Sequence, residues 1–265
     1  MVWDVMQRDC VTGLQGLDPG SVPLIVCDSP YNFGQPYAAY KDNKPHDKFL
    51  AWLQSWLSAA SQALAPHGSL WVFVPDEWAD ELSVYCRRTL NLTRRRWVIW
   101  VFTFGQAARK NFTRSHCHIL YFSKSATKFT WNEEGLRVPS ARQLVYNDKR
   151  ANQRGKLPDD TWLLLESQLA PHMGGDRDVW LQSRVCGTFH ERQHHSPNQI
   201  PLPLMERIVR STSQPGDLVV DPFLGTGTTG VASVLHGRQF LGFDISAECV
   251  AQSRLRIEEA LKQVS

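Results

Sequence analysis

The sequence predicts an α/β fold, in which a doubly wound, mostly parallel sheet carries helices on both faces. Short apolar runs that suit buried strands alternate with longer segments of helical periodicity in both halves of the chain. Between about residues 125 and 190 this rhythm weakens, and the strand and helix signals become short and polar. We therefore expect a single α/β domain over residues 1–265, with an inserted lobe at 125–190.

The first half of the chain contains four strand signals and two helix signals. A buried strand at 24–27 follows the turn-forming Asp18-Pro19-Gly20 and runs into a loop. Apolar residues then recur at helical spacing over 48–64, until Pro66-His67-Gly68 ends the helix. The other elements expected in this half are a strand at 70–74, a helix at 76–88, and strands at 97–104 and 119–122.

The α/β pattern returns near residue 201. There a helix is predicted over 201–210, with proline near its first turn. The elements expected after it are a strand at 217–221, a glycine loop that runs into a helix over 225–235, a strand at 239–244 and a closing helix at 247–262.

Composition excludes several classes of protein. No apolar run approaches the ~20 residues that span a bilayer, and Met1 to Asp9 contain no apolar core of a secretory signal. The six cysteines are scattered without a CxxC pair, which argues against a zinc site or a disulfide framework. Three histidines near residue 192 lack cysteine or carboxylate partners at ligand spacing. We expect a cytoplasmic protein with reduced thiols, no metal and no membrane contact.

Basic residues gather in two stretches, although the net charge is only +3. Solvated surface charge is the simplest explanation. Aromatic residues are interleaved with the basic ones, however, and this mixture is typical of nucleic-acid binding. The first stretch contains Arg87, Arg88, Arg94, Arg95, Arg96, Arg109, Lys110 and Arg114, and the second contains Arg137, Arg142, Lys149, Arg150, Arg154 and Lys156.

A glycine loop near the C-terminus predicts a nucleoside-cofactor site. It follows the strand that ends at Asp221, and its glycines stand at 225, 227 and 230. Such a turn lets a backbone and a helix N-terminus approach a ligand closely. Asp244 ends the next strand about 20 residues later, where a carboxylate can accept ribose hydroxyls. The loop lacks the Gly-Lys-Ser/Thr of a P-loop, and spacing alone does not name the cofactor.

The tetrapeptide Asp28-Ser29-Pro30-Tyr31 follows a buried strand, so we expect it at the carboxyl edge of the sheet, where α/β folds bind ligands. An exocyclic amine on a base is a poor nucleophile, because its lone pair is conjugated with the ring. The Asp28 carboxylate and the Ser29 carbonyl can accept its two N–H bonds and stabilise the growing positive charge. Tyr31 can stack on a base flipped out of the duplex. A plain loop turn is the alternative.

Together the two motifs resemble the amino-methyltransferases of DNA, which act on adenine N6 or cytosine N4 and carry a (D/N/S)PP(Y/F) catalytic motif. The resemblance implies a Rossmann-like, S-adenosylmethionine-dependent methyltransferase fold. The catalytic motif precedes the cofactor loop, as in the beta group, with target recognition between them. Asp28, Ser29, Pro30 and Tyr31 are then catalytic. The expected cofactor-binding residues are Asn198, Gln199, Asp221, Phe223, Gly225, Gly227, Thr228 and Asp244.

The resemblance also implies partners and leaves alternatives open. The substrate is double-stranded DNA, and a homodimer and a cognate restriction endonuclease are possible partners. Ser29 departs from the proline usual at its position, which removes ring rigidity from the catalytic loop. Aspartate at position 28 favours adenine N6 over cytosine N4. The remaining alternatives are a catalytically weakened nucleic-acid-binding protein and, against the motif evidence, a nicotinamide oxidoreductase.

Overall fold

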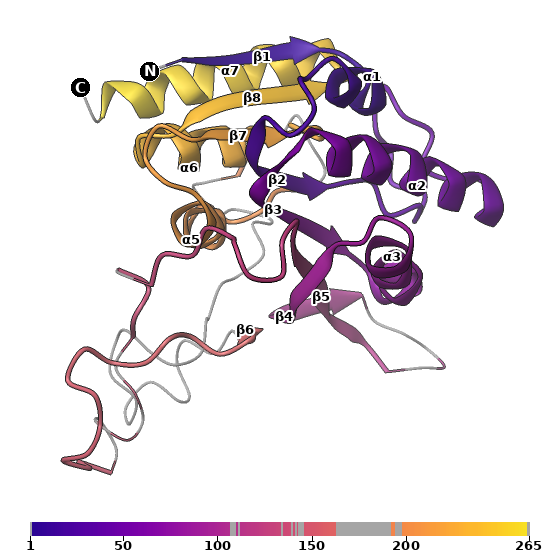
Figure 1. Cartoon of the computed structure of the whole chain (residues 1–265). Helices are drawn as coiled ribbons and strands as arrows, with labels where there is room; N and C mark the ends of the chain where they lie inside the picture. The colour runs from indigo at the N-terminus through magenta and orange to yellow at the C-terminus, as the bar shows by residue number, and fades with distance from the viewer. Residues whose placement is uncertain are drawn as a thin grey trace.

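The computed structural model describes residues 2–106, 110, 112–133, 135–138, 140, 142, 146–162, 192–193 and 198–263. In this part of the chain an eight-stranded sheet has the order β1-β8-β7-β2-β3-β5-β4-β6 (Figure 1). The strands are β1 (Trp3–Gln7), β2 (Val22–Asp28), β3 (Leu64–Val74), β4 (Thr93–Gln106), β5 (Arg114–Ser123), β6 (Thr161–Trp162), β7 (Leu218–Asp221) and β8 (Gln239–Asp244). The helices are α1 (Cys10–Gln15), α2 (His46–Ala63), α3 (Asp76–Arg88), α5 (Leu202–Thr212), α6 (Thr228–Leu235) and α7 (Ala247–Lys262).

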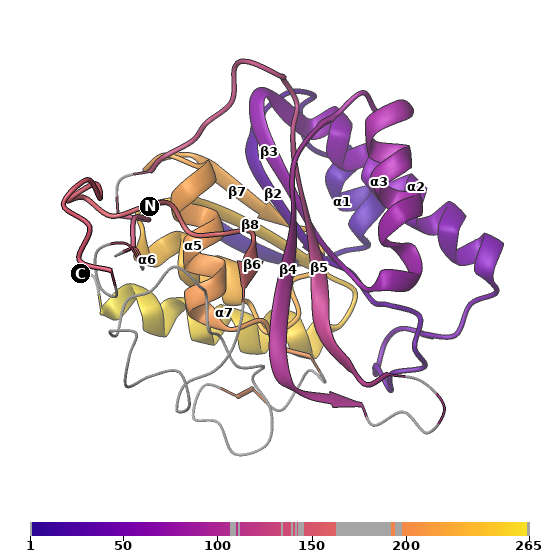
Figure 2. The ribbon, with the colours of Figure 1, turned by 90° about the horizontal axis from the view of Figure 1, so that it is seen from below.

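The predicted fold class is confirmed. The five strands from β1 to β3 in the spatial order are mutually parallel. Strand β5 runs antiparallel to both of its neighbours, β3 and β4. Figure 2 shows α1, α2 and α3 on one side of the strands and α5, α6 and α7 on the other. A parallel sheet covered on both faces places all its carboxyl-terminal strand ends along one edge, where α/β folds bind ligands.

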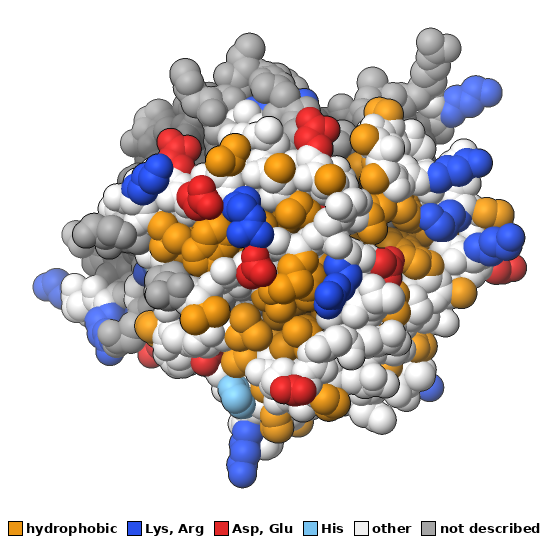
Figure 3. Space-filling view, turned by 90° about the horizontal axis from the view of Figure 1, so that it is seen from above, with side chains coloured by type: hydrophobic (Ala, Val, Ile, Leu, Met, Phe, Trp, Pro, Cys, Tyr) orange, Lys and Arg blue, Asp and Glu red, His pale blue; other side chains and the backbone are white. Residues whose placement is uncertain are grey.

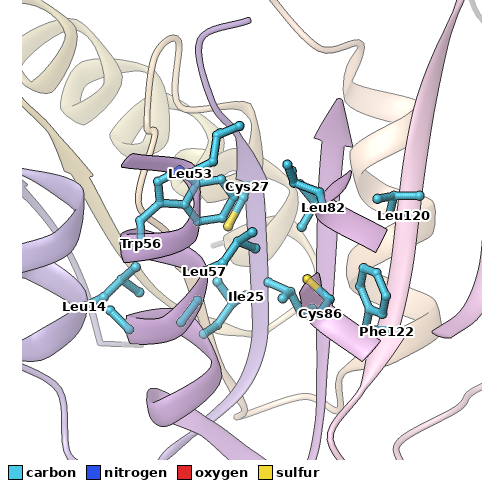
Figure 4. Packing of buried hydrophobic residues seen from close by; sticks show 14 of the residues in the cluster. Leu14, Ile25, Cys27, Leu53, Trp56, Leu57, Leu82, Cys86, Leu120 and Phe122 are labelled. Carbon is cyan, nitrogen blue, oxygen red and sulfur yellow. The ribbon is translucent and has the colours of Figure 1, made fainter. Parts of the chain in front are cut away.

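The hydrophobic core consists of two clusters, one on each face of the sheet. Alternate residues of β2 supply them: Leu24 and Val26 belong to the cluster under α5, α6 and α7, while Ile25 and Cys27 belong to the cluster under α1, α2 and α3. This follows from the two-residue period of side chains along a strand. Figure 4 shows the second cluster, in which Ile25 and Cys27 face Trp56 and Leu57 of α2. Because both faces are buried, β2 consists almost entirely of apolar residues.

Most of the predicted elements are present, but the N-terminal pair was missed. Strand β1 lies at the edge of the sheet and buries only Val5 fully, so its residues form no apolar run. Helix α1 has six residues, too few for a periodic pattern. It begins at Asp9, whose carboxylate accepts hydrogen bonds from the Val11 and Thr12 amides at 3.0 and 3.2 Å. Strands β4 and β5 are longer than predicted, because their pairing with each other extends them into polar sequence. The prediction that Pro66-His67-Gly68 ends the helix was wrong: α2 ends at Ala63, and β3 begins at Leu64, which pairs with Val22 of β2, so these three residues lie within the strand.

The described residues of the expected lobe at 125–190 contain one short strand, β6, and one isolated bridge between Val138 and Lys156. Figure 1 shows them leading away from the sheet beyond α5. Asn132 attaches the start of this segment to the C-terminal end of α5. Its side-chain amide donates to the carbonyls of Arg210 and Ser213 at 3.0 and 2.7 Å. The lobe boundaries stay a prediction. None of the helices in the described ranges combines the length and apolarity that crossing a membrane requires.

Candidate functional site

Three carboxylates lie at the ends of three adjacent parallel strands. Asp28 ends β2, Asp221 ends β7 and Asp244 ends β8, and these strands are neighbours in the order β8-β7-β2. The first motif of the chain and its last motif are nearly 200 residues apart in sequence, yet the sheet order brings them to one edge. The topology itself therefore assembles the candidate site.

A cavity of about 360 Å³ opens at this edge. Its size falls within the usual range for small-molecule and cofactor sites. Ten of the twelve predicted site residues line it, namely Asp28, Ser29, Pro30, Tyr31, Asn198, Asp221, Phe223, Gly225, Thr228 and Asp244. The other two support its walls. Gln199 is buried and accepts a hydrogen bond from the Gln193 amide at 2.7 Å, and Gly227 is the N-cap of α6.

The glycine loop is tied directly to the acidic end of β8. One carboxylate oxygen of Asp244 accepts the Gly225 amide at 2.9 Å, and the other accepts the Ser246 amide at 2.8 Å. The Gly225 carbonyl in turn accepts the Ser253 hydroxyl at 3.0 Å. Gly227 has a φ of +74°, a conformation that side chains other than glycine rarely adopt. The loop and the ribose-binding candidate are thus one hydrogen-bonded unit.

Replacing Gly227 with alanine is expected to lower the free energy of unfolding by about 1–3 kcal/mol. The left-handed conformation penalises a Cβ atom by about 1–2 kcal/mol. A Cβ at this position would also lie 2.8 Å from Ser253 Cβ. Gly20→Ala is the matched control, because Gly20 has a φ of +73° and nothing within 4 Å of its Cβ position. Denaturant titration should give the larger loss for Gly227→Ala; equal losses would contradict the steric argument.

Asp221 is a buried carboxylate at the end of β7, where the glycine loop begins. It accepts the Phe223 amide at 2.9 Å and the Thr229 hydroxyl at 2.5 Å. Burial raises the pKa of Asp221 to about 6, and the nearby Asp244 carboxylate adds to the rise, while the two hydrogen bonds oppose it. Removing the charge from water therefore outweighs the hydrogen bonds, and the site favours any cation that approaches this carboxylate.

The raised pKa of Asp221 predicts a specific pH dependence of stability. A raised native pKa means that the folded state binds the proton more tightly than the unfolded state does. The resulting stabilisation is present below about pH 4 and is lost as the pH rises through about 6. Its size is at most roughly 3 kcal/mol, since one pKa unit corresponds to about 1.4 kcal/mol. The unfolding free energy of the wild type relative to Asp221→Asn should fall across this window; a constant difference would contradict the assignment.

The tetrapeptide places its first and last residues in contact. The Tyr31 hydroxyl donates to Asp28 Oδ1 at 2.9 Å and lies 3.4 Å from the Cys117 sulfur on β5. Burial raises the pKa of Tyr31 well above its usual value, and the Asp28 carboxylate raises it further. The phenol therefore stays protonated and keeps donating to the carboxylate. Ser29 is buried beside them with 5% of its surface exposed.

Several residues of the cavity wall carried no signal in the sequence. Trp52 is one of the apolar residues at helical spacing over 48–64, a pattern that predicts core packing, but it lines the cavity and its ring lies 5.9 Å from that of Phe223. Cys10 follows β1 and reaches the cavity by the same strand-end rule that applies to the aspartates. Tyr37 and Tyr40 come from the loop between β2 and α2. Strand β1 was not recognised, and the loop has no periodicity, so neither contribution was predicted.

The basic stretches are less available for a ligand than their sequence suggested. Arg95 lies 3.5 Å from the Phe129 ring and donates to the Ala126 carbonyl, while Arg114 pairs with Asp76 and Glu77. Four more are paired with acids: Arg137 with Glu133, Arg142 and Arg150 with Asp148, and Lys156 with Asp159. Exposed pairs of this kind contribute only about 0–1 kcal/mol, so phosphates can replace the acids. Arg109 lies outside the described residues.

Basic and acidic side chains occur together on one face of the molecule. Figure 3 looks onto the side formed by β1 and α7, where Lys and Arg side chains alternate with Asp and Glu among hydrophobic areas. Several Lys and Arg side chains also lie close together at the right-hand edge of this view. The exposed apolar side chains of this region include Val2, just before β1, and Leu255 on α7. Among the described residues, no group of three or more His, Cys, Asp or Glu side chains is arranged to hold a metal ion.

Comparison with known proteins gives concordant matches. A family model described as "DNA methylase" matches residues 22–254. The type II methyltransferase M.HpaI of Haemophilus parainfluenzae is 29% identical over 94% of this chain and 72% of its own length. The DNA adenine methyltransferase YhdJ of Escherichia coli K12 is 28% identical over 97% of this chain and 83% of its own length. The structure of PvuII DNA methyltransferase, titled cytosine-N4-specific, superposes with a TM-score of 0.69 at 15% identity, covering 100% of this chain and 93% of that one.

Proposed function

Because the chain belongs to the DNA methylase family of N6-adenine and N4-cytosine methyltransferases, we propose that it methylates adenine N6 at a specific site in double-stranded DNA. Family membership makes it an S-adenosylmethionine-dependent DNA methyltransferase. Family membership does not decide between adenine and cytosine, so the choice of adenine is our proposal. It is supported by aspartate at the first position of the catalytic motif and by the adenine-specific name of YhdJ.

The charge and the apolar wall residues of the cavity support S-adenosylmethionine as its ligand. S-adenosylmethionine supplies an activated methyl group on a positively charged sulfur. The Asp221 and Asp244 carboxylates line the cavity at the glycine loop and favour a cationic ligand. The apolar part of the wall, which includes Phe223, Trp52 and Tyr40, suits a planar adenine ring. We assign Asp244 to the ribose hydroxyls and Asn198 to the methionine end.

One observation carries the catalytic proposal: the Asp28 carboxylate lies at the cavity and already receives a hydrogen bond from the Tyr31 hydroxyl at 2.9 Å. A carboxylate accepts several hydrogen bonds, so Asp28 can also take an N–H of the target amine. With the Ser29 carbonyl as second acceptor, both N–H bonds of the amine would be engaged and its lone pair would be left free to react. The bound cofactor would supply the methyl group, whose bond to sulfur breaks as the bond to nitrogen forms; Asp28 would stabilise the positive charge that passes to the nitrogen, which then loses one proton to solvent.

Tyr31 has two roles in this proposal. Its ring forms one wall against which the flipped base stacks, and its hydroxyl orients Asp28. Target recognition is assigned to the lobe at 125–190, because its sequence lies between the two motifs and a few side chains displayed to base edges are enough to read a DNA sequence. The homodimer and the restriction endonuclease stay predictions of the resemblance.

The test is transfer of labelled methyl from S-adenosylmethionine to unmethylated DNA, followed by nucleoside analysis of the digest and mapping of the modified site. N6-methyladenine is the expected product. N4-methylcytosine would overturn the assignment of the base and leave the mechanism at Asp28 intact. Bound cofactor with no product would favour the catalytically weakened alternative, in which Ser29 has disarmed the loop.

A further inference from the structure

The loop after the catalytic motif is held rigidly by a single buried carboxylate. Asp42 has 3% of its surface exposed. Its Oδ1 accepts the Asn32 amide at 2.8 Å, and its Oδ2 accepts the amides of Phe33 and Gln35, both at 3.0 Å. The Asp42 carbonyl also accepts the Gly34 amide at 2.6 Å. Four consecutive backbone amides thus converge on one residue.

Asn32 reinforces this clamp from the other side. It adopts a φ of +64°, which turns the chain sharply after Tyr31. Its side-chain amide donates to the Lys44 carbonyl at 2.8 Å and accepts the Lys44 amide at 2.7 Å. The Tyr31 carbonyl accepts the Trp78 indole N–H at 3.2 Å. Residues 31–35 are therefore fixed relative to the sheet and to α3.

The clamp presents Phe33 to solvent directly beside the catalytic motif. The side chain is 39% exposed, and its ring meets that of Tyr31 edge-to-face with centroids 5.9 Å apart. The Arg114 guanidinium covers the ring at 4.8 Å, and Arg114 is itself held by Asp76 and Glu77. Backbone, ring and covering cation are all ordered, so Phe33 would lose little conformational entropy when it contacts a partner.

Single exposed apolar residues are common and need no explanation by themselves. Phe33 differs from Leu255, which is 61% exposed on α7, because it touches the residue proposed to stack on the target base. A base that leaves the duplex opens a gap in the stack, and unstacking costs a few kcal/mol. Apolar side chains inserted at such steps offset part of this cost.

We propose that Phe33 enters the DNA base stack beside the base that is flipped toward Asp28, and that the Asp42 clamp holds it in position to do so. This inference rests on the proposed function, because it requires a flipped target base. It adds a DNA-contacting residue outside the catalytic tetrapeptide. It also gives a function to the buried Asp42 carboxylate, which orders the loop that exposes Phe33.

The test compares Phe33→Ala with the matched control Leu255→Ala on two duplexes. One duplex carries the mapped target site with normal pairing, and in the other the target base faces an abasic position. On the paired duplex Phe33→Ala should lower kcat/KM by about tenfold or more, the equivalent of about 1.4 kcal/mol. On the abasic duplex, where the target base is already unpaired, the loss should largely disappear. Leu255→Ala should match the wild type on both duplexes.

Two further readouts separate this role from a structural one. With 2-aminopurine at the target position, the fluorescence increase on binding should be smaller for Phe33→Ala than for the wild type. Affinity for S-adenosylmethionine should be unchanged. Equal loss on both duplexes, or loss of cofactor affinity, would overturn the proposal and indicate that Phe33 only supports Tyr31. Wild-type behaviour on the paired duplex would also overturn it.

The design remains informative in two difficult cases. If Phe33→Ala does not fold, Phe33→Gln keeps side-chain length without an apolar surface and should show the same dependence on pairing. If the wild type transfers no methyl group to DNA, the proposed function has failed before any variant is compared. The two failures are therefore distinguishable.

Discussion

Replacing Asp28 with alanine is expected to reduce methyl transfer at least ~10²–10³-fold, the scale seen when one preorganised electrostatic group is removed from a catalytic site. The carboxylate lies at the end of β2, in the cavity and in contact with Tyr31. Alanine cannot accept the N–H of the target amine and leaves the Tyr31 hydroxyl without its acceptor. Binding of S-adenosylmethionine should persist, because the glycine loop and Asp244 are untouched.

Asp28→Asn is the informative companion variant. Asparagine keeps an acceptor oxygen and occurs at this position of the family motif, so part of the activity should remain. Single-turnover transfer to DNA and a calorimetric titration of cofactor should be measured for both variants. Unchanged turnover in Asp28→Ala would refute the mechanism, and loss of cofactor binding would move Asp28 into the cofactor site.

Asp244→Ala is expected to weaken S-adenosylmethionine binding by about 1–3 kcal/mol, which corresponds to roughly 5- to 150-fold in Kd. Loss of the ribose contacts is one reason for the weaker binding, and the structure provides a second. The Asp244 carboxylate accepts the amides of Gly225 and Ser246, so its removal also releases the glycine loop. Turnover at saturating cofactor should change little.

A suitable control for this variant is Asp217→Ala. Asp217 accepts the Gln214 amide before β7, at the end of that strand opposite the cavity, and it does not line the cavity. Its replacement should leave cofactor affinity unchanged. Calorimetric titration of both variants decides the matter: equal affinity for wild type and Asp244→Ala would remove Asp244 from the cofactor site.

The sequence by itself determined the fold class and the ends of the strands that matter. Buried parallel strands must be apolar along their whole length, so β2 and β7 stand out from their surroundings, and the polar residue that ends each one is visible without a structure. Asp28 and Asp221 end these two strands, whereas Asp244 was predicted from its spacing of about 20 residues after the glycine loop. The glycine loop could also be recognised in the sequence. Gly227 has a left-handed backbone conformation, which favours glycine, so the conformation leaves a trace in the residue type.

Only the tertiary structure decided which residues complete the cavity and which merely support it. Trp52 has the spacing of a core residue on α2, but packing against Phe223 turns it into a cavity wall. Gln199 is among the residues predicted to bind the cofactor, yet it does not line the cavity and instead accepts the Gln193 amide. Asp42 lies in a loop without periodicity, and its role depends on backbone amides brought to it by the turn at Asn32. Local patterns record burial and backbone conformation, whereas these roles come from contacts between elements, which no short stretch of sequence encodes.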